Sequence, residues 1–268
     1  MSVIVSSLYT YPVKSLRGNG QRVLDVTDWG PDRDRRWMVI DESGQFVTQR
    51  QQPKMCLIAA EIKGDALRLW NLKQPENGIC VDYGRAKIER EVFVWEDNCT
   101  ALDAGDEAAE WLSDELGARL RLCYMPESTQ RQVALPYGAP GDRVSFADGF
   151  PFLLCNEASL QVLSSVLGRE LDIQRFRPNI VISGAPAFAE DGWKKICIGG
   201  VEFDLVKPCA RCAIPTVNLE DASREPDVFR VLQAQRKRDG EVYFGQNMIH
   251  RAHGAVAVGD AVDVLLTN

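Results

Sequence analysis

Short runs of β-branched and aromatic residues, separated by tight-turn sequences, recur along most of the chain and restrict it to a fold rich in short strands. The first run, residues 3–9, is expected to end before Pro12, because proline cannot donate a ladder hydrogen bond. Further strands are expected at residues 37–40, 46–49, 57–62, 67–70, 92–95, 179–183, 201–206, 242–248 and 255–266. The first four of these form two expected hairpins, 37–40 with 46–49 and 57–62 with 67–70, each around a Gly-containing turn. This pattern predicts an α+β class, dominated by short antiparallel strands that close into barrels.

Three helices are expected between these strands, because apolar residues recur at helical spacing in three segments: 108–116, 160–167 and 228–235. Asn156 is the expected N-cap of the second helix, and Gly117 and Gly168 are expected to end the first two. The third helix is expected to begin near Pro226 and to end in the basic run 236–238, which suits the negative end of a helix dipole.

The length of 268 residues corresponds to about two domains, and the proline-rich segment 126–148 is expected to connect them or to form a long functional loop. The start of the chain lacks the features of a signal peptide, and no run approaches about 18 apolar residues, so a membrane span is not expected. Eight cysteines are too few for a disulfide scaffold and indicate a reducing compartment, the cytoplasm. Six of them stand alone in or beside apolar stretches and are expected to be buried: Cys56, Cys80, Cys99, Cys123, Cys155 and Cys197.

The charged residues exclude one class of partner and suggest another. Lys and Arg number 31 against 38 Asp and Glu, which gives a net charge of −7, whereas proteins that bind nucleic acid polymers need cations to neutralise phosphates. Cations nevertheless cluster where predicted strands begin or end: Lys14 beside Ser15, Arg35, and Arg177 before Asn179. The sequence therefore predicts a site for a small anion, held by charge-assisted hydrogen bonds.

The two remaining cysteines, Cys209 and Cys212, form a close pair after the strand predicted at 201–206. Pro208 is expected to end that strand, so that both cysteines lie on a loop. Lys207 and Arg211 flank the pair, and nearby cations favour the thiolate, which is the form that binds metal or attacks a substrate.

Four interpretations of the cysteine pair are open. A thioredoxin-like redox pair would have to open a helix, whereas the residues that follow, with Pro215, have an extended pattern. A structural zinc site needs four ligands, which Cys209 and Cys212 could form with His250 and His253, at a shorter His spacing than is usual. The pair could also be two buried structural thiols. In the fourth interpretation, a single exposed thiolate binds a soft transition metal.

Nine segments of the sequence occur in the order of a known protein family: Tyr11-Pro-Val-Lys-Ser15, Asp34-Arg35, Thr48-Gln-Arg-Gln51, Phe146-Ala-Asp-Gly149, Asn156-Glu-Ala-Ser-Leu160, Phe176-Arg-Pro-Asn179, Lys207-Pro-Cys-Ala-Arg-Cys212, Phe244-Gly-Gln-Asn247 and Val258-Gly-Asp260. In these segments the chain resembles the MOSC-domain proteins with an N-terminal MOSC barrel, which are the bacterial YcbX type and the mitochondrial amidoxime-reducing components. The resemblance extends from about residue 3 to residue 266. It implies an N-terminal MOSC-associated β-rich domain at 1–120 and a MOSC domain at 121–268.

The resemblance also implies a molybdenum cofactor (molybdopterin), bound between the two β-rich domains. Cys212 matches the family cysteine that ligates molybdenum and is the implied catalytic residue, whereas Cys209 is expected to be a neighbouring structural thiol. The implied cofactor-binding positions are Lys14, Ser15, Arg35, Asp148, Arg177, Asn179, Ala210 through its backbone, Arg211, Gln246 and Asn247. A soft thiolate for the metal and cations for an anionic group agree with the analysis of the residues themselves.

The activity of the family implies reduction of small N-hydroxylated compounds, such as hydroxylamines, N-hydroxylated base analogues and amidoximes, to the parent amine or amidine. The YcbX type carries a further iron–sulfur domain built on a four-cysteine pattern, which does not occur in these 268 residues. We therefore expect electrons from a separate flavoprotein reductase or ferredoxin-like partner, and neither a nucleic acid polymer nor a membrane as a partner. Two alternatives are a non-catalytic carrier of the cofactor or its sulfur, and a zinc-stabilised binding module.

Overall fold

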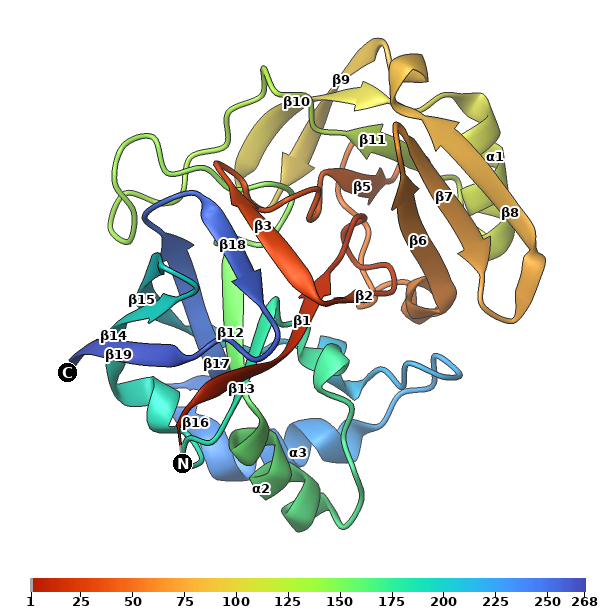
Figure 1. Ribbon diagram of the computed structural model, residues 1–268. Coiled ribbons are helices and arrows are strands. Elements are labelled where there is room, and N and C mark those ends of the chain that lie inside the picture. Colours follow the sequence, from red (N-terminus) through yellow and green to blue (C-terminus); the bar gives the residue numbers. More distant parts are fainter. Residues whose placement is uncertain (1) are drawn as a thin grey trace.

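The computed structural model describes residues 2–268, and its largest sheet collects nine strands from both ends of the chain (Figure 1). These strands are β1 (Ile4–Thr10), β2 (Asn19–Gln21), β12 (Phe152–Asn156), β13 (Ile180–Ser183), β14 (Trp193–Ile198), β15 (Val201–Ala210), β16 (Lys237–Arg238), β17 (Glu241–His250) and β19 (Val262–Thr267). The order is β19-β14-β15-β17-β12-β13-β1-β2, with β16 paired to β17. Neighbouring strands are antiparallel except β12 and β13, which are parallel and are connected through a helix.

Three smaller sheets complete the strand-rich architecture. Their strands are β5 (Trp37–Ile40), β11 (Arg121–Tyr124), β10 (Asp97–Asp103) and β9 (Ile88–Val94) in the first sheet; β6 (Ile58–Lys63), β7 (Ala66–Asn71) and β8 (Gln74–Asp82) in the second; and β18 (Gly254–Ala257), β3 (Val23–Thr27) and β4 (Gly30–Pro31) in the third. The pairing of β3 with β18 again joins the beginning and the end of the chain. The predicted strand-dominated α+β class is confirmed.

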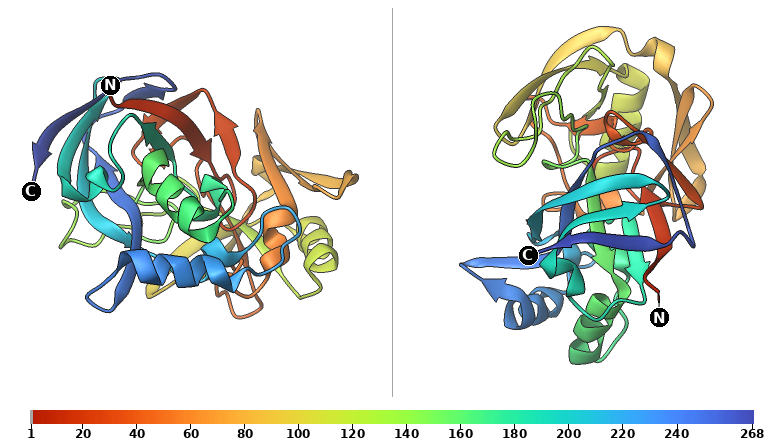
Figure 2. Two further views of the ribbon diagram at one scale, coloured as in Figure 1. Left: turned by 90° about the horizontal axis from the view of Figure 1, so that it is seen from below. Right: turned by 60° about the vertical axis from the view of Figure 1, so that its left-hand side comes forward.

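The three predicted helices are confirmed at α1 (Asp106–Leu116), α2 (Glu157–Leu167) and α3 (Pro226–Arg236). The Asn156 side chain caps α2 by accepting a 3.0 Å hydrogen bond from the backbone N–H of Ala158. Gly117 and Gly168 end α1 and α2 in the left-handed conformation, with φ of 67° and 76°. Helices α2 and α3 pack together at one end of the molecule (Figures 1 and 2). Within residues 2–268, no helix has the length and apolar character needed to cross a membrane.

Three strand predictions are wrong in their extent. Residues 46–49 do not form a second hairpin strand. Beyond the turn, the backbone contacts with β5 are an isolated bridge between Phe46 and Ile40 and a 2.8 Å hydrogen bond from the Val47 N–H to the Val39 carbonyl. Strand β15 does not end at Pro208 but continues to Ala210, since its register against β17 shifts on either side of the proline. The segment predicted at 255–266 divides into β18 and β19.

The basic run at the end of α3 also differs from its prediction. Only Arg236 belongs to the helix, whereas Lys237 and Arg238 form the short strand β16, which pairs with the start of β17. Of the three basic residues, only Arg236 therefore lies in the last turn of the helix, where a positive charge interacts favourably with the helix dipole. The guanidinium of Arg236 is held by the Asp191 carboxylate.

The molecule has two large apolar cores, and the second includes residues from both halves of the chain. Trp37, Leu69 and Leu112 belong to the core of the first half, and Val5, Phe152 and Phe203 to the core within the nine-stranded sheet. Of the lone cysteines, four are buried as predicted: Cys56, Cys99, Cys123 and Cys155. The prediction is wrong for Cys80, which is exposed on β8, and for Cys197, which is only half-buried.

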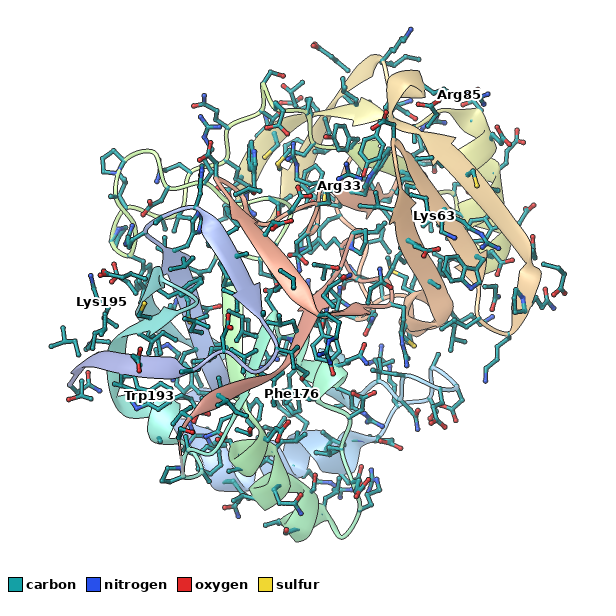
Figure 3. All side chains as sticks on the ribbon, viewed as in Figure 1. Arg33, Lys63, Arg85, Phe176, Trp193 and Lys195 are labelled. Atoms are coloured by element: carbon teal, nitrogen blue, oxygen red, sulfur yellow. The ribbon has the colours of Figure 1, made fainter. Side chains whose placement is uncertain are left out.

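Cations are distributed unevenly between the surface and the interior. Lys63 and Arg85 lie on the surface (Figure 3), with side chains 65% and 71% exposed. By contrast, Lys14 and Arg35 are only 5% and 9% exposed. Because buried cations are costly unless they are paired, these two positions mark the part of the interior where a charged site is built.

Candidate functional site

One pocket is formed by residues from the first 50 positions together with residues 147–247. Of the eleven site residues that the sequence predicts, ten line this pocket: Lys14, Ser15, Arg35, Asp148, Arg177, Asn179, Ala210, Arg211, Cys212 and Asn247. The eleventh, Gln246, is not brought to it. Its side chain is buried and donates a 2.7 Å hydrogen bond to the carboxylate of Asp191.

Three of the pocket residues have an unusual backbone conformation. Ser15, Arg35 and Arg177 have positive φ angles of 67°, 50° and 56°, in the left-handed region that non-glycine residues rarely occupy. Ser15 and Arg35 lie in turns, Arg177 ends the short 3₁₀ helix Ile173–Phe176, and all three line the pocket. Strained backbone of this kind clusters at functional sites, so the conformations support the prediction of a binding site here.

Arg35 is fixed by hydrogen bonds at both of its terminal nitrogens. Nη1 donates to the Asp34 carboxylate at 2.5 Å and to the Asn179 side-chain oxygen at 3.2 Å, and Nη2 donates to the Arg177 carbonyl at 3.1 Å. Asp34 in turn accepts a 2.7 Å hydrogen bond from the backbone N–H of Tyr11. These contacts join the turn after β1, the segment before β5 and the segment before β13 into one rigid wall.

Tyr11 supports two of the pocket arginines through its ring. The guanidinium carbons of Arg35 and Arg177 lie 4.6 Å and 4.1 Å from the centre of the fully buried Tyr11 ring. Burial, together with the charge of nearby Arg35, lowers the pKa of Arg177 to about 10. The aromatic ring thus holds together two cations that would otherwise repel each other.

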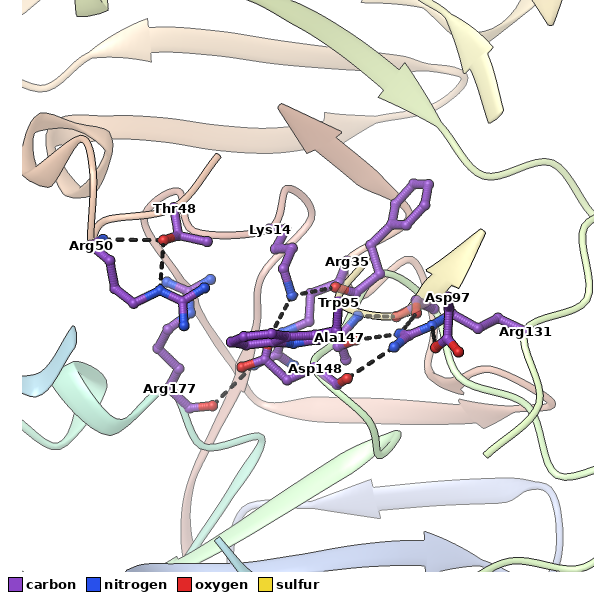
Figure 4. A network of polar contacts seen from close by, with 12 residues as sticks. Lys14, Arg35, Thr48, Arg50, Trp95, Asp97, Arg131, Ala147, Asp148 and Arg177 are labelled. Atoms are coloured by element: carbon purple, nitrogen blue, oxygen red, sulfur yellow. Dashed lines mark hydrogen bonds and ion pairs between the residues drawn. The ribbon is translucent and has the colours of Figure 1, made fainter. Parts of the chain in front are cut away.

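Lys14 connects the pocket to the loop before β12 (Figure 4). Its Nζ donates to the carbonyl of Phe146 at 2.8 Å and to the Asp148 carboxylate at 2.5 Å. Burial lowers the pKa of Lys14 to about 8, against the opposing influence of Asp148. The same loop is fixed from its other side by Arg131, which donates to the carbonyls of Ala147 and Asp148 and also pairs with Asp97.

The two paired cysteines are half-buried and both line the pocket. Arg211 Nη1 contacts the sulfur of Cys209 at 2.8 Å, and Nη2 of the same guanidinium donates to the Phe176 carbonyl. A thioredoxin-like arrangement is absent from residues 2–268, because the pair is followed by the short 3₁₀ helix η5 (Ile214–Thr216) and opens no α-helix. The interpretation as two buried structural thiols is wrong in its burial, because both cysteines are only half-buried.

The zinc interpretation is wrong as well. Across the described residues 2–268, no group of three or more His, Cys, Asp and Glu side chains is placed to hold a metal ion. His253 is exposed and lies 2.7 Å from Asp28, and His250 lines a separate surface pocket with it. The two histidines therefore do not complete a ligand set for Cys209 and Cys212.

Several pocket residues were missed as individual site candidates. Arg175 lines the pocket and donates to Glu225 at 2.5 Å, and Thr48 and Arg50 form another part of the wall. Thr48 and Arg50 belong to one of the nine family segments, so that segment carried the signal for both. Together with Lys14, Arg35, Arg177 and Arg211, these residues give the pocket six cations against the single carboxylate of Asp148 among the described lining residues.

An anionic group fits this pocket, because several buried arginine nitrogens have no other partner. Arg175 Nε, Arg177 Nη2 and Arg211 Nε make no hydrogen bond to any described residue, although all three are shielded from solvent. Buried donors are almost always satisfied, so unpaired donors in one pocket indicate a ligand with acceptor oxygens. The Cys212 thiol in the same wall is a suitable ligand for a soft metal.

Two family models match the chain and together cover most of it. Residues 2–119 match the "MOSC N-terminal beta barrel domain" and residues 141–263 match the "MOSC domain". Mitochondrial amidoxime-reducing component 1 from Mus musculus and its Homo sapiens counterpart are each 32% identical to the chain, over 97% of its length and 82% of theirs. The Danio rerio protein named molybdenum cofactor sulfurase is 29% identical over 97% of this chain and 34% of its own length.

Proposed function

The chain belongs to the family of MOSC proteins with an N-terminal MOSC β-barrel domain that includes the mitochondrial amidoxime-reducing components, and from this premise we propose that it is a molybdenum-cofactor-dependent reductase of N-hydroxylated compounds. One observation carries the proposal. Three buried arginine nitrogens without a partner among residues 2–268 belong to residues that line the same pocket as Cys212. An anion site and a soft metal ligand are the two requirements of a metal held by a phosphate-bearing cofactor.

Different parts of the pocket would hold different parts of the cofactor. Arg175, Arg177 and Arg211 would offer their unpaired nitrogens to its anionic group, and buried Lys14 would add a fourth positive charge beside Ser15. Cys212 would ligate the metal. When bound, this cofactor supplies two-electron chemistry at an oxygen atom, whereas the protein supplies binding, orientation and electrostatics.

The proposed reaction breaks the N–O bond of a hydroxylamine or amidoxime. Two electrons and two protons convert the N-hydroxyl compound to the amine or amidine and one molecule of water. We propose that the electrons come from a separate flavoprotein or ferredoxin-like protein. The chain's own contribution is to hold the reacting centre in a pocket whose cations stay fixed in position, so that little reorganisation is needed during the reaction.

Replacement of Cys212 by serine tests the proposal. We expect Cys212→Ser to lose bound molybdenum and to reduce amidoxime turnover with a chemical reductant by at least about 100-fold, because serine is a poor ligand for a soft metal. The matched control is Cys209→Ser, which changes the neighbouring thiol and should retain molybdenum. Unchanged far-UV circular dichroism in both variants would show that the fold is intact. Full activity and full metal content in Cys212→Ser would contradict the proposal.

A carrier function is the second candidate, and one observation favours it. The chain is 29% identical to a protein named molybdenum cofactor sulfurase, and its pocket contains a second thiol, Cys209, in contact with Arg211. A carrier of the cofactor or its sulfur would transfer its cargo to an acceptor apoenzyme and would show no turnover with a reduced mediator. The same preparation can therefore distinguish the two functions.

A further inference from the structure

The pocket adjoins a larger groove, with which it shares part of its wall. The groove has a volume of about 1110 Å³ and shares seven wall residues with the pocket: Arg50, Asp148, Gly149, Phe150, Cys209, Ala210 and Asn247. Lys14, Arg35, Arg177 and Cys212 line the pocket but not the groove. The residues proposed to bind the anion and the metal therefore line the pocket alone, and the seven shared residues form the wall where the pocket and the groove adjoin.

Aromatic side chains distinguish the walls of this groove. Trp95 and Tyr137 are 49% and 38% exposed, although both are large enough to be buried in most proteins. Trp95 packs against Phe46 with ring centres 5.2 Å apart, and Tyr137 packs against Phe150 at 5.6 Å. The groove thus offers two preformed pairs of aromatic rings, which suit a flat ligand.

Trp95 is held in its position by three independent features. Its backbone has a positive φ of 59°, in the turn that joins β9 and β10. Its indole N–H donates a 3.3 Å hydrogen bond to Asp148, the partner of Lys14 (Figure 4), and the guanidinium of Arg50 lies 4.5 Å from its ring centre. A strained backbone that keeps an exposed tryptophan against a binding pocket indicates a role in function.

We propose that this aromatic groove holds the organic part of the substrate and selects N-hydroxylated groups attached to a planar aromatic or heteroaromatic ring, with Trp95 and Tyr137 as specificity-determining residues. The inference rests on the proposed function, because it assigns the substrate class to the same site. Stacking on fixed rings is available to a planar substrate and not to a short aliphatic one. A substrate ring in the groove would place its N-hydroxyl group toward the adjoining pocket, where Cys209 and Ala210 belong to both walls.

The test compares benzamidoxime and acetamidoxime as substrates of the cofactor-loaded protein. We expect Trp95→Leu to raise KM for benzamidoxime by about three- to tenfold, the usual contribution of one aromatic contact, and to leave KM for acetamidoxime within about twofold. Trp95→Phe should restore most of the loss. Trp70→Leu, which changes a tryptophan outside the groove, is the matched control. An equal effect of Trp95→Leu on both substrates would overturn the proposal.

Two further measurements separate this proposal from the function on which it rests. Released pterin and molybdenum should be unchanged in Trp95→Leu; if both are lost, Trp95 belongs to the cofactor site and the proposal is wrong. Calorimetric titration with benzamidine and acetamidine, which contain no N–O bond to reduce, measures the selectivity of the groove without turnover. If the wild-type protein reduces neither amidoxime but binds benzamidine selectively through Trp95, the proposed reductase function is wrong and the proposed selectivity of the groove is supported. If benzamidine binds no more tightly than acetamidine, the proposed selectivity of the groove is wrong.

Discussion

Lys14 gives the site a pH dependence with two opposite consequences. Its pKa of about 8 in the folded protein is below the ordinary value of 10.5, so between these pH values the unfolded chain binds more protons than the folded one. Folding stability should therefore rise with pH across this window. Binding of an anion, however, needs the charged lysine and should weaken as pH rises above about 8, by at most about tenfold per pH unit for one linked proton.

The measurement is thermal unfolding of the cofactor-free protein from pH 7 to pH 10, with and without inorganic phosphate. We expect the melting temperature without phosphate to rise relative to that of Lys14→Met, and the stabilisation by phosphate to fall over the same range. Because other groups titrate in this window, the difference between wild type and Lys14→Met is the informative quantity. Parallel curves for the two proteins would show that Lys14 is not the titrating group.

Gly18 controls the position of the Tyr11 ring and, through it, the pocket arginines. A Cβ atom at Gly18 would lie 2.3 Å from Tyr11 Cε1, which forces the fully buried ring to move. Because Arg35 and Arg177 both rest on that ring, we expect Gly18→Ala to lower reductase activity on the order of tenfold or more, through misplacement of both guanidinium groups.

Gly20→Ala is the matched control for Gly18→Ala, since a Cβ there meets nothing within 4 Å. Phosphate-dependent stabilisation separates a displaced anion site from general destabilisation. Gly18→Ala should lose that stabilisation at a temperature where its circular dichroism is still native, and Gly20→Ala should keep it. Equal behaviour of the two variants would rule out a positioning role for Tyr11.

At the scale of single residues, the sequence predicted those features of the site that depend on neighbouring residues in the chain, and not those that depend on tertiary contacts. Gln246 and Asn247 are neighbours in β17, where successive side chains point to opposite faces, so only one of the two could reach the pocket. The alternation was readable from the sequence, but the choice between the faces depends on the partner strands β12 and β15. The positive φ angles at Ser15, Arg35 and Arg177 could not be predicted, because each is imposed by tertiary contacts rather than by residue type.

Among the secondary-structure elements, α2 depends most on a single side chain. Asn156 caps the helix and also donates to the Pro186 carbonyl at 2.8 Å and to buried Glu190 at 3.0 Å. Asn156→Ala would remove the cap and leave the Glu190 carboxyl with fewer partners in a position only 1% exposed. We expect a loss of about 2–4 kcal/mol in the free energy of unfolding, from the cap and the unsatisfied group together.

Urea denaturation measures this loss, with Gln161→Ala on the exposed face of α2 as the control, which should change stability by less than about 0.5 kcal/mol. The result also bears on the site, since β12, whose last residue is Asn156, leads from the pocket into α2. A cost below about 1 kcal/mol for Asn156→Ala would mean that water replaces the lost contacts.

The ends of the helices were more predictable than the ends of the strands, and the difference has a physical cause. Helix ends are fixed by local caps, and Asn156, Gly117 and Gly168 stand in the sequence beside the segments they terminate. The continuation of β15 past Pro208 depends on the register shifts that its partner β17 tolerates. Pro208 was therefore expected to end the strand, but β15 continues past it to Ala210.

At the scale of the whole molecule, strands from the beginning of the chain interlock with strands of its second half. β1 pairs with β13, so β1 and β2 join a sheet whose other strands come from residues 152–267. β3 pairs with β18, so the three-stranded sheet β18-β3-β4 also combines strands from the beginning and the end of the chain. Such pairings join residues more than 150 positions apart, and no local pattern in the sequence announces them. They also explain how one pocket comes to be lined by Lys14 and by Cys212.

The interlocking predicts that the second half does not fold alone. A fragment of residues 121–268 would retain β12, β13 and β17 but lose β1 beside β13 and β3 beside β18. Val5 and Leu8 of β1 are fully buried in the core of the nine-stranded sheet, so the fragment would expose that core and an unpaired strand edge. We expect the isolated fragment to show no cooperative thermal transition by near-UV circular dichroism, and to become soluble and cooperative when residues 1–120 are co-expressed with it. A sharp transition in the fragment alone would instead show that residues 121–268 form a domain that is stable without β1 and β3, and that the early strands only cover it.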